Sequence, residues 1–267
     1  MKHVLFIGVA GLLVAVSLGF MQVKQVTRKV LVAAEMQEGD GANVKRLFPT
    51  GNFRHQDPFV LIDEFFVTPP AGFPPHPHRG FEAITYMIDG EFRHEDNLGN
   101  ASTVASGGAQ RFTAGKGIVH SEMPGKVGTA HGLQLWINLP QRLKKMDPGY
   151  QQVNAKDFPV EKVGNVEIKH VVGGSSPLKL NTLVVYQDIS MGSNSNHSIT
   201  LQPGFTGFLY VLRGSLSVDA QQVSASQAVL LDVTDKFIVS TKTGGRFVLI
   251  SGLPHDEPIR QRGPYVD

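Results

Sequence analysis

The chain of 267 residues contains no cysteine. Disulfide bonds, iron–sulfur clusters, thiolate metal ligands and cysteine nucleophiles are therefore excluded together. Net charge is also nearly absent, because 25 Lys and Arg stand against 23 Asp and Glu, which leaves +2. Without a strong positive charge or a Lys/Arg cluster, nothing in the sequence favours a nucleic-acid-binding surface.

Long internal hydrophobic runs are missing as well, and 29 glycines and 16 prolines separate short apolar stretches. This pattern favours many strands and turns over long helices. Residues 83–88, for example, run into the turn Asp89-Gly90, and residues 91–94 return as the hairpin partner. Residues 132–139 alternate as a half-buried strand does. An all-β chain is the prediction.

The one long apolar run, residues 4–20, stands at the start of the chain and looks like a targeting segment. As a helix of about 17 residues it would span roughly 25 Å, short of a ~30 Å hydrocarbon core. Ser17 and Gly19 are small residues suited to cleavage, whereas the basic residues just beyond them oppose export. We expect residues 1–26 to export the chain, either as a cleaved signal peptide into the periplasm or as a retained membrane anchor. A misassigned start, with a cytoplasmic chain beginning near Thr27, is the alternative.

Two pairs of polar residues carry the strongest chemical signal. His76 and His78 form one pair, and His120 and Glu122 form the other, each at i, i+2 spacing. On a strand, residues two apart point to the same face and can bind one ion together. Two such strands meeting inside a barrel would supply three imidazoles and one carboxylate, a set that suits Fe, Mn, Co, Ni, Cu or Zn. The alternative is four ordinary polar residues at turns.

An internal repeat indicates the architecture. Residues 80–92 are echoed with the same spacing by residues 204–216, and residues 116–120 are echoed by residues 236–240. Two similar β-barrel halves fit this repeat best. In this register, four residues replace the ligands in the second half: Thr200, Gln202, Ser240 and Lys242. We therefore expect one metal per chain, in the N-terminal half, and expect His197 to be a surface or loop residue.

Other polar and aromatic residues have simpler interpretations. Five aromatic residues are expected in the core rather than as a substrate platform: Phe65, Phe66, Phe81, Tyr86 and Trp136. Four histidines are expected either in solvent or beside the metal ligands: His94, His131, His170 and His255. Ser121 follows His120, but strand alternation places it on the opposite face, which disfavours nucleophilic hydrolysis.

Several stretches together resemble the pirin family of bicupins, within the cupin superfamily. They include F-P-P-H-P-H-R-G-F-E at 73–82, T-A-G-K-G-I-V-H-S-E-M-P at 113–124 and G-L-Q-L-W-I-N-L-P at 132–140. The block E-P-I-R-Q-R-G-P-Y-V at 257–266 resembles the C-terminal pirin domain. The resemblance runs from about Thr27 to the end of the chain.

The resemblance implies two cupin-type β-sandwich barrels, jelly-roll-like and face to face. The first, residues 27–145, would hold Fe(II) through the positions of His76, His78, His120 and Glu122. A connection over 146–174 would lead to a metal-free second barrel, residues 175–267. Mn, Ni, Co, Cu or Zn are the other ions considered. Glu82 stands where many other cupins carry their acidic ligand, and is the rival to Glu122.

Two functions follow from the resemblance. Some pirin-like proteins are quercetin 2,3-dioxygenases, which would make a flavonol and O2 the substrates here and Glu122 a proton acceptor from the flavonol hydroxyl. Pirins also act as regulatory proteins that bind a protein partner, such as a transcription factor or a metabolic enzyme, in a metal-dependent way. An exported chain could not reach such partners, so the apolar N-terminal segment favours the enzyme.

Overall fold

The computed structural model describes residues 27–126, 128–232 and 236–267. The expected signal peptide or anchor, residues 1–26, lies outside the described residues. Within the described ranges, no helix is long and apolar enough to cross a membrane.

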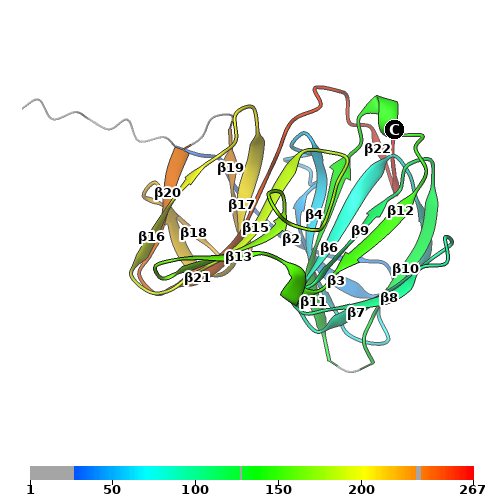
Figure 1. The fold of residues 1–267 in the computed structure, drawn as a ribbon, viewed down its shortest axis with the longest axis horizontal. Coiled ribbons are helices and arrows are strands. Elements are labelled where there is room, and N and C mark those ends of the chain that lie inside the picture. The colour runs from blue at the N-terminus through cyan, green and yellow to red at the C-terminus, as the bar shows by residue number, and fades with distance from the viewer. Residues whose placement is uncertain (1–26, 127, 233–235) are drawn as a thin grey trace, which may run out of the picture.

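Two antiparallel β-barrels lie next to each other, as Figure 1 shows. The strands of the first barrel are β2 (Ala34–Glu38), β3 (Ala42–Phe48), β4 (Phe59–Val67), β5 (Phe73–His78), β6 (Phe81–Asp89), β7 (Glu91–Asp96), β8 (Ala101–Ala105), β9 (Ala109–Thr113), β10 (Ile118–Pro124), β11 (Ala130–Asn138) and β12 (Gly149–Val153). They form one sheet in the order β12-β9-β6-β11-β4-β3-β2 and a second in the order β5-β10-β7-β8.

The second barrel repeats this plan. Its strands are β1 (Val30–Val32), β13 (Val160–Val163), β14 (Val166–Val172), β15 (Val184–Met191), β16 (Ser195–Thr200), β17 (Thr206–Val218), β18 (Gln221–Ser224), β19 (Gln227–Leu231), β20 (Lys236–Thr241) and β21 (Gly245–Gly252). The main path is β1-β19-β17-β21-β15-β14-β13, and β16, β20 and β18 cover its other side. Single 3-10 turns, η1 (Gln141–Leu143) and η2 (Ala155–Asp157), precede and follow β12. The predicted all-β, two-barrel fold is confirmed.

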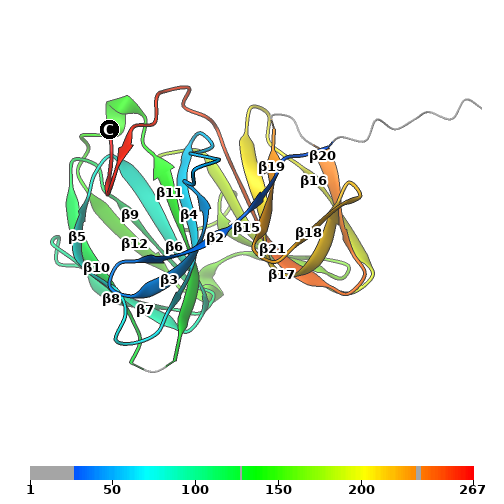
Figure 2. The ribbon, with the colours of Figure 1, turned by 180° about the vertical axis from the view of Figure 1, so that it is seen from behind.

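The chain crosses between the barrels more often than the sequence suggested. Near the N-terminus, β1 pairs with β19 of the second barrel, and Figure 2 shows the chain then passing to the first barrel. Residues 146–174, expected as a connection, supply β12 to the first barrel and both β13 and β14 to the second. These strands at or near the sheet edges have one solvated face, so their apolar pattern is weak. Last, β22 (Gln261–Arg262) and β23 (Tyr265–Val266) form a hairpin whose Tyr265 bridges Arg79 of the first barrel.

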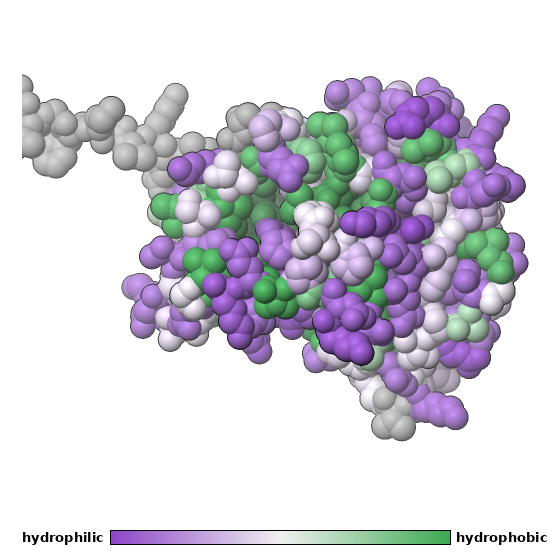
Figure 3. All heavy atoms as spheres, viewed as in Figure 1, coloured by the Kyte–Doolittle hydropathy of each residue, from purple (hydrophilic) through white to green (hydrophobic). Residues whose placement is uncertain are grey.

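The largest hydrophobic core lies between the two barrels. It includes Phe48 and Phe59 of the first barrel and Phe208 of the second, all 0% exposed. The Phe208 ring lies edge-on to both, with centroids 5.5 Å from Phe48 and 5.6 Å from Phe59. Each such side chain contributes about 1.5–3 kcal/mol on burial. The outer surface is mixed: on the face of Figure 3, hydrophobic residues form small groups among hydrophilic ones.

The interiors of the two barrels differ. In the second barrel one apolar cluster, including Ile199, Phe237 and Val239, fills the space between the sheets. In the first barrel two separate apolar clusters occur, one around Phe65 and Phe92 and another around Phe81 and Phe112. Buried polar residues, including His78, His120 and Glu122, lie beside these clusters in the first barrel. The interior of the second barrel is instead filled by apolar side chains.

Candidate metal centre

Strands β5 and β10 bring the two polar pairs together. They are antiparallel neighbours, with His76 opposite His120 and His78 opposite Ile118. Three of the six β5 residues are proline, which cannot donate to a ladder, and β5 accordingly lies at the edge of its sheet. The turn after β5 requires Gly80: its φ is +84°, and a Cβ there would lie 1.9 Å from the Val266 carbonyl oxygen.

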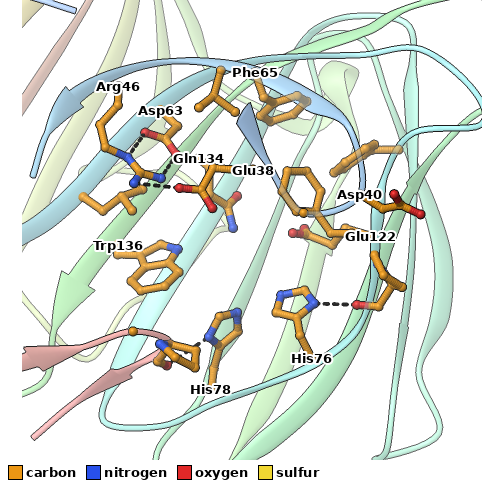
Figure 4. A pocket seen from close by; sticks show the side chains of 18 of the residues that line it. Glu38, Asp40, Arg46, Asp63, Phe65, His76, His78, Glu122, Gln134 and Trp136 are labelled. Carbon is orange, nitrogen blue, oxygen red and sulfur yellow. Dashed lines mark hydrogen bonds and ion pairs between the residues drawn. The ribbon is translucent and has the colours of Figure 1, made fainter. Parts of the chain in front are cut away.

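Three imidazoles converge at this point. His76, His78 and His120 each offer a ring nitrogen, and these atoms all lie within 4.8 Å of one another. The Nε2 atoms of His76 and His120 are 3.0 Å apart. Two nitrogens that each lie about 2.1 Å from one ion, at right angles, would be separated by about 3.0 Å. The donor set therefore fits a transition metal, and Figure 4 shows His76 and His78 directed into one cavity.

Each of these rings has its other nitrogen held in place. His76 Nδ1 lies 2.8 Å from the Pro74 carbonyl oxygen, and His78 Nδ1 lies 3.1 Å from the Pro264 carbonyl oxygen. A carbonyl only accepts, so both Nδ1 atoms carry hydrogen and both Nε2 atoms keep a free lone pair. His120 Nδ1 faces a further ring, that of His94, at 3.5 Å. Fixing one nitrogen in this way orients metal-binding histidines in general.

The two glutamates have different surroundings. Glu122 is 4% exposed, lines the cavity, and forms a metal-capable group with His120 and His94 rather than with all three clustered imidazoles. Its Oε1 accepts hydrogen bonds from Thr85 Oγ1 at 2.9 Å and from Gln110 Nε2 at 2.6 Å.

Glu82, by contrast, is fully buried and fully engaged elsewhere. It accepts hydrogen bonds from Thr113 Oγ1 and from both the backbone and side-chain nitrogens of Asn181, each at 2.8 Å. It belongs to neither metal-capable group among the described residues. The structure thus uses Glu82 to hold the segment before β15 against the first barrel.

Burial keeps two of the imidazoles neutral. Desolvation, followed by the neighbouring charge of His76, lowers the pKa of His78 to about 3. Desolvation, with smaller effects from His76, His78 and His94, lowers the pKa of His120 well below 6.5. Neutral imidazole is the form that binds a metal, so both rings are in the binding state at neutral pH.

A cavity of about 750 Å³ opens above the cluster. Its walls carry aromatic rings, including Phe73, Phe92 and Trp136. Its far side carries an ion-pair group, in which the Arg46 guanidinium contacts Asp63 at 2.6 and 2.8 Å and Glu38 at 2.8 Å (Figure 4). Residues of the C-terminal hairpin complete the wall: Gln261, Gly263 and Pro264. The size suits a small organic ligand.

Among the described residues, both metal-capable groups lie in the first barrel. The cross-strand register of the second barrel differs from the one that the sequence repeat predicted. Ser240 lies opposite Asn196, and Thr200 lies opposite Lys236. His197, expected at the surface or in a loop, lies on β16 and is half-buried, opposite the fully buried Val239. The sequence repeat does not reveal this change of register, because local similarity between strands does not specify which residues pair across them.

His94, expected either in solvent or beside the metal ligands, lies beside His120, one of the proposed ligands. It is 0% exposed and lies on β7, which pairs with β10. Strand alternation places Phe92, His94 and Asp96 on the same face of β7, because each is two residues from the next. Of the other histidines, His131 contacts Glu64 at 2.9 Å, away from the three clustered imidazoles.

The aromatic residues mostly match the expectation. Phe65, Phe81 and Tyr86 are at most 2% exposed, and Phe66 stacks on His131. Trp136 differs: it stacks on Phe81 at 4.2 Å but also lines the cavity.

Comparison with known proteins agrees with this geometry. Residues 41–137 match the pirin family model, and residues 186–267 match the model of the pirin C-terminal cupin domain. A pirin-like protein of Solanum lycopersicum is 40% identical over 256 residues, covering 92% of this chain and 88% of the relative.

Solved structures share the fold. A quercetin 2,3-dioxygenase of Acinetobacter baumannii superposes with a TM-score of 0.82 at 27% identity, covering 89% of this chain and 90% of that one. The bacterial pirin YhhW of Escherichia coli, solved in complex with nickel(II), has a TM-score of 0.72 at 20% identity, covering 85% and 99%. The motifs, the paired barrels and both family matches agree, and the chain belongs to the pirin family.

Proposed function

We propose that this chain is a metal-dependent dioxygenase of the quercetin 2,3-dioxygenase type, with Fe(II) as its ion. The main support is the cluster of three imidazoles, two of which, His76 and His78, line a cavity of about 750 Å³. The proposed ligands are His76, His78, His120 and Glu122. The similarity to a quercetin 2,3-dioxygenase of known structure supports the substrate class. Mn, Ni, Co, Cu and Zn also suit this donor set, and the related nickel(II) complex illustrates that breadth.

The residues around the cavity would each perform a task. A bound redox-active ion would supply electron exchange between an electron-rich flavonol and dioxygen. Phe73, Phe92 and Trp136 would pack against the flavonol rings and exclude water. Glu122 Oε2 accepts no hydrogen bond from the described residues, since Thr85 and Gln110 both donate to Oε1. That oxygen is free to take the proton of the flavonol hydroxyl.

The test is oxygen consumption by the purified full chain with quercetin, beside elemental analysis of bound metal. One dioxygen enters and one CO leaves for each flavonol opened, so CO release is a second readout. A double variant, His76→Ala with His120→Ala, should lose both the metal and the oxygen uptake. Near one Fe per chain with uptake that the variant lacks is the expected result. Bound metal without uptake on any flavonol would overturn the enzyme proposal and favour a metal-dependent regulatory protein that binds a protein partner.

We also propose that residues 1–26 export the chain. The support is the apolar run of residues 4–20 behind a basic start. Cell fractionation of a C-terminally tagged full chain should place it in the periplasmic or membrane fraction. Recovery in the cytoplasm alone would contradict export.

A further inference from the structure

His94 and Asp96 form a buried pair directly behind the candidate metal centre. Both side chains are 0% exposed, and His94 Nε2 lies 3.0 Å from Asp96 Oδ2. The His94 ring stacks on Tyr150, with centroids 4.3 Å apart and planes at 20°. Asn100 donates to both carboxylate oxygens of Asp96 through Nδ2, and the backbone nitrogens of Leu98 and Asn100 donate to Oδ1. Both oxygens of Asp96 therefore have donors, and the His94 ring is held by Asp96 at Nε2 and by the stacked Tyr150 ring.

The chemistry of each partner determines which atom donates the hydrogen in these contacts. An ionised carboxylate only accepts, so His94 carries its hydrogen on Nε2 and presents a bare Nδ1. That Nδ1 faces His120 Nδ1 at 3.5 Å. A hydrogen bond across this gap requires the hydrogen to be on His120, which leaves His120 Nε2 with a free lone pair. His120 Nε2 is the atom that lies 3.0 Å from His76 Nε2.

We propose that Asp96 and His94 are positioning residues that set the tautomer and orientation of His120 for metal binding. The inference rests on the metal site of the proposed function, but not on its reaction. His76 and His78 obtain the same tautomer from backbone carbonyls. His120 lies inside the barrel, where His94 takes the place of a carbonyl, and Asp96 makes that ring an acceptor. Groups that orient a metal ligand in this way are typically worth about 10–100-fold in affinity.

Asp96→Asn tests whether Asp96, acting through His94, sets the tautomer of His120. The substitution changes the shape of the side chain very little. An amide at this position can place its Nδ2 hydrogen on His94 Nε2, which would move the His94 hydrogen to Nδ1. His120 would then receive a hydrogen bond at Nδ1 and carry its own hydrogen on Nε2, the proposed metal-binding atom. Zn(II) affinity of the full chain, measured against a chromophoric chelator, should fall about 10–100-fold. Asp147→Asn makes the same change at a carboxylate whose side chain is 86% exposed. It is the matched control and should bind Zn(II) as the unmodified chain does.

The second readout is the tautomer itself. Long-range ¹H–¹⁵N spectra of histidine-labelled protein distinguish a protonated Nδ1 from a protonated Nε2. In the chain without added metal, we expect His120 to be protonated at Nδ1, and in Asp96→Asn at Nε2. A purely structural role of Asp96 would lower stability without moving this proton. Neither readout depends on oxygen uptake. The positioning role of Asp96 and His94 can therefore be tested even if the chain proves not to be a dioxygenase.

Three results would overturn the proposal that Asp96 and His94 position His120. The first is a protonated Nε2 on His120 in the unmodified chain. This measurement does not depend on whether a variant folds. The second is unchanged Zn(II) affinity in folded Asp96→Asn or in His94→Phe, which keeps a ring but has no nitrogen. The third is two Zn(II) per chain, because His94, His120 and Glu122 also form a metal-capable group. In that case His94 would be a ligand and not a positioning residue.

Discussion

Two buried glutamates of the first barrel illustrate how partners decide a residue's role. Glu122 faces the cavity with one oxygen held by Thr85 and Gln110, whereas Glu82 is occupied by Thr113 and Asn181. Glu122→Gln should lower Zn(II) affinity by at least about 100-fold, because the amide lacks the charge that balances the ion. Chelator competition measures this loss.

Glu82→Gln is the matched control, with the same change in shape and charge. It should lower the free energy of unfolding by about 1–3 kcal/mol, because an amide hydrogen would face the Asn181 donors. Its metal affinity should stay unchanged. The reverse pattern would make Glu82 the acidic ligand, as in many other cupins.

Lys144 gives the fold a specific pH dependence. It is 9% exposed, and its Nζ donates to Gly80 O, Asn138 Oδ1 and Val266 O at 2.8–3.0 Å. Burial lowers its pKa from 10.5 to about 8. Between these two values the unfolded chain binds more protons than the folded one, so this residue makes stability rise with pH there, by about 1 kcal/mol per pH unit.

Lys144→Met should remove that contribution. At about pH 7 the variant should be less stable by about 1–3 kcal/mol, because three buried acceptors each lose the hydrogen bond from Lys144. The difference in unfolding free energy between the two chains should then widen toward about pH 9.5. Urea titrations at several pH values measure it, and parallel pH profiles would contradict the assignment.

At the scale of elements, the hairpin of β22 and β23 joins the second half of the chain to the metal centre. Pro264 O holds His78 Nδ1, and Val266 is 0% exposed in the cluster with Phe81 and Phe112. Deleting residues 261–267 should weaken Zn(II) binding about 10-fold, because His78 loses its acceptor. The same deletion should lower the unfolding free energy by about 2–4 kcal/mol.

Asp267→Asn is the control for that deletion. Its ion pair with Arg79 at 2.9 Å joins side chains that are both 45% exposed. Exposed pairs contribute at most about 1 kcal/mol. An effect of this variant as large as that of the deletion would show that the ion pair, rather than Pro264 and Val266, holds the hairpin.

At the scale of the whole molecule, matching tyrosines connect the barrels. Tyr86 donates to Asp188 at 2.6 Å, and Tyr210, its counterpart in the repeat, donates to Glu64 at 2.7 Å. Tyr86→Phe and Tyr210→Phe should each cost about 1.5–3 kcal/mol, since both bonds reach a carboxylate. Tyr265→Phe, whose hydroxyl bonds to none of the described residues, should cost much less.

The shared core also predicts how the chain unfolds. Phe48, Phe59 and Phe208 pack across the barrels, so neither barrel can open without exposing the same apolar surface. We expect one cooperative transition in urea, with coincident signals from fluorescence and circular dichroism. Two separate transitions would contradict a single folding unit.

The sequence by itself determined the features that depend on local geometry. Alternation along a strand places His76 with His78 and His120 with Glu122, whatever the rest of the chain does. The repeat and the turn residues likewise predicted two barrels of short strands, and the absence of cysteine limited the ligands to imidazole and oxygen.

Tertiary structure decided whatever depends on pairing between distant segments. Cross-strand register places His197 opposite Val239, and no local pattern specifies that choice. The return of Pro264 to His78 spans 186 residues, and the Asp96–His94–His120 contact exists only because β7 and β10 are neighbours. Backbone alternation is a short-range property of the chain, whereas these contacts depend on which apolar faces pack together in the folded molecule.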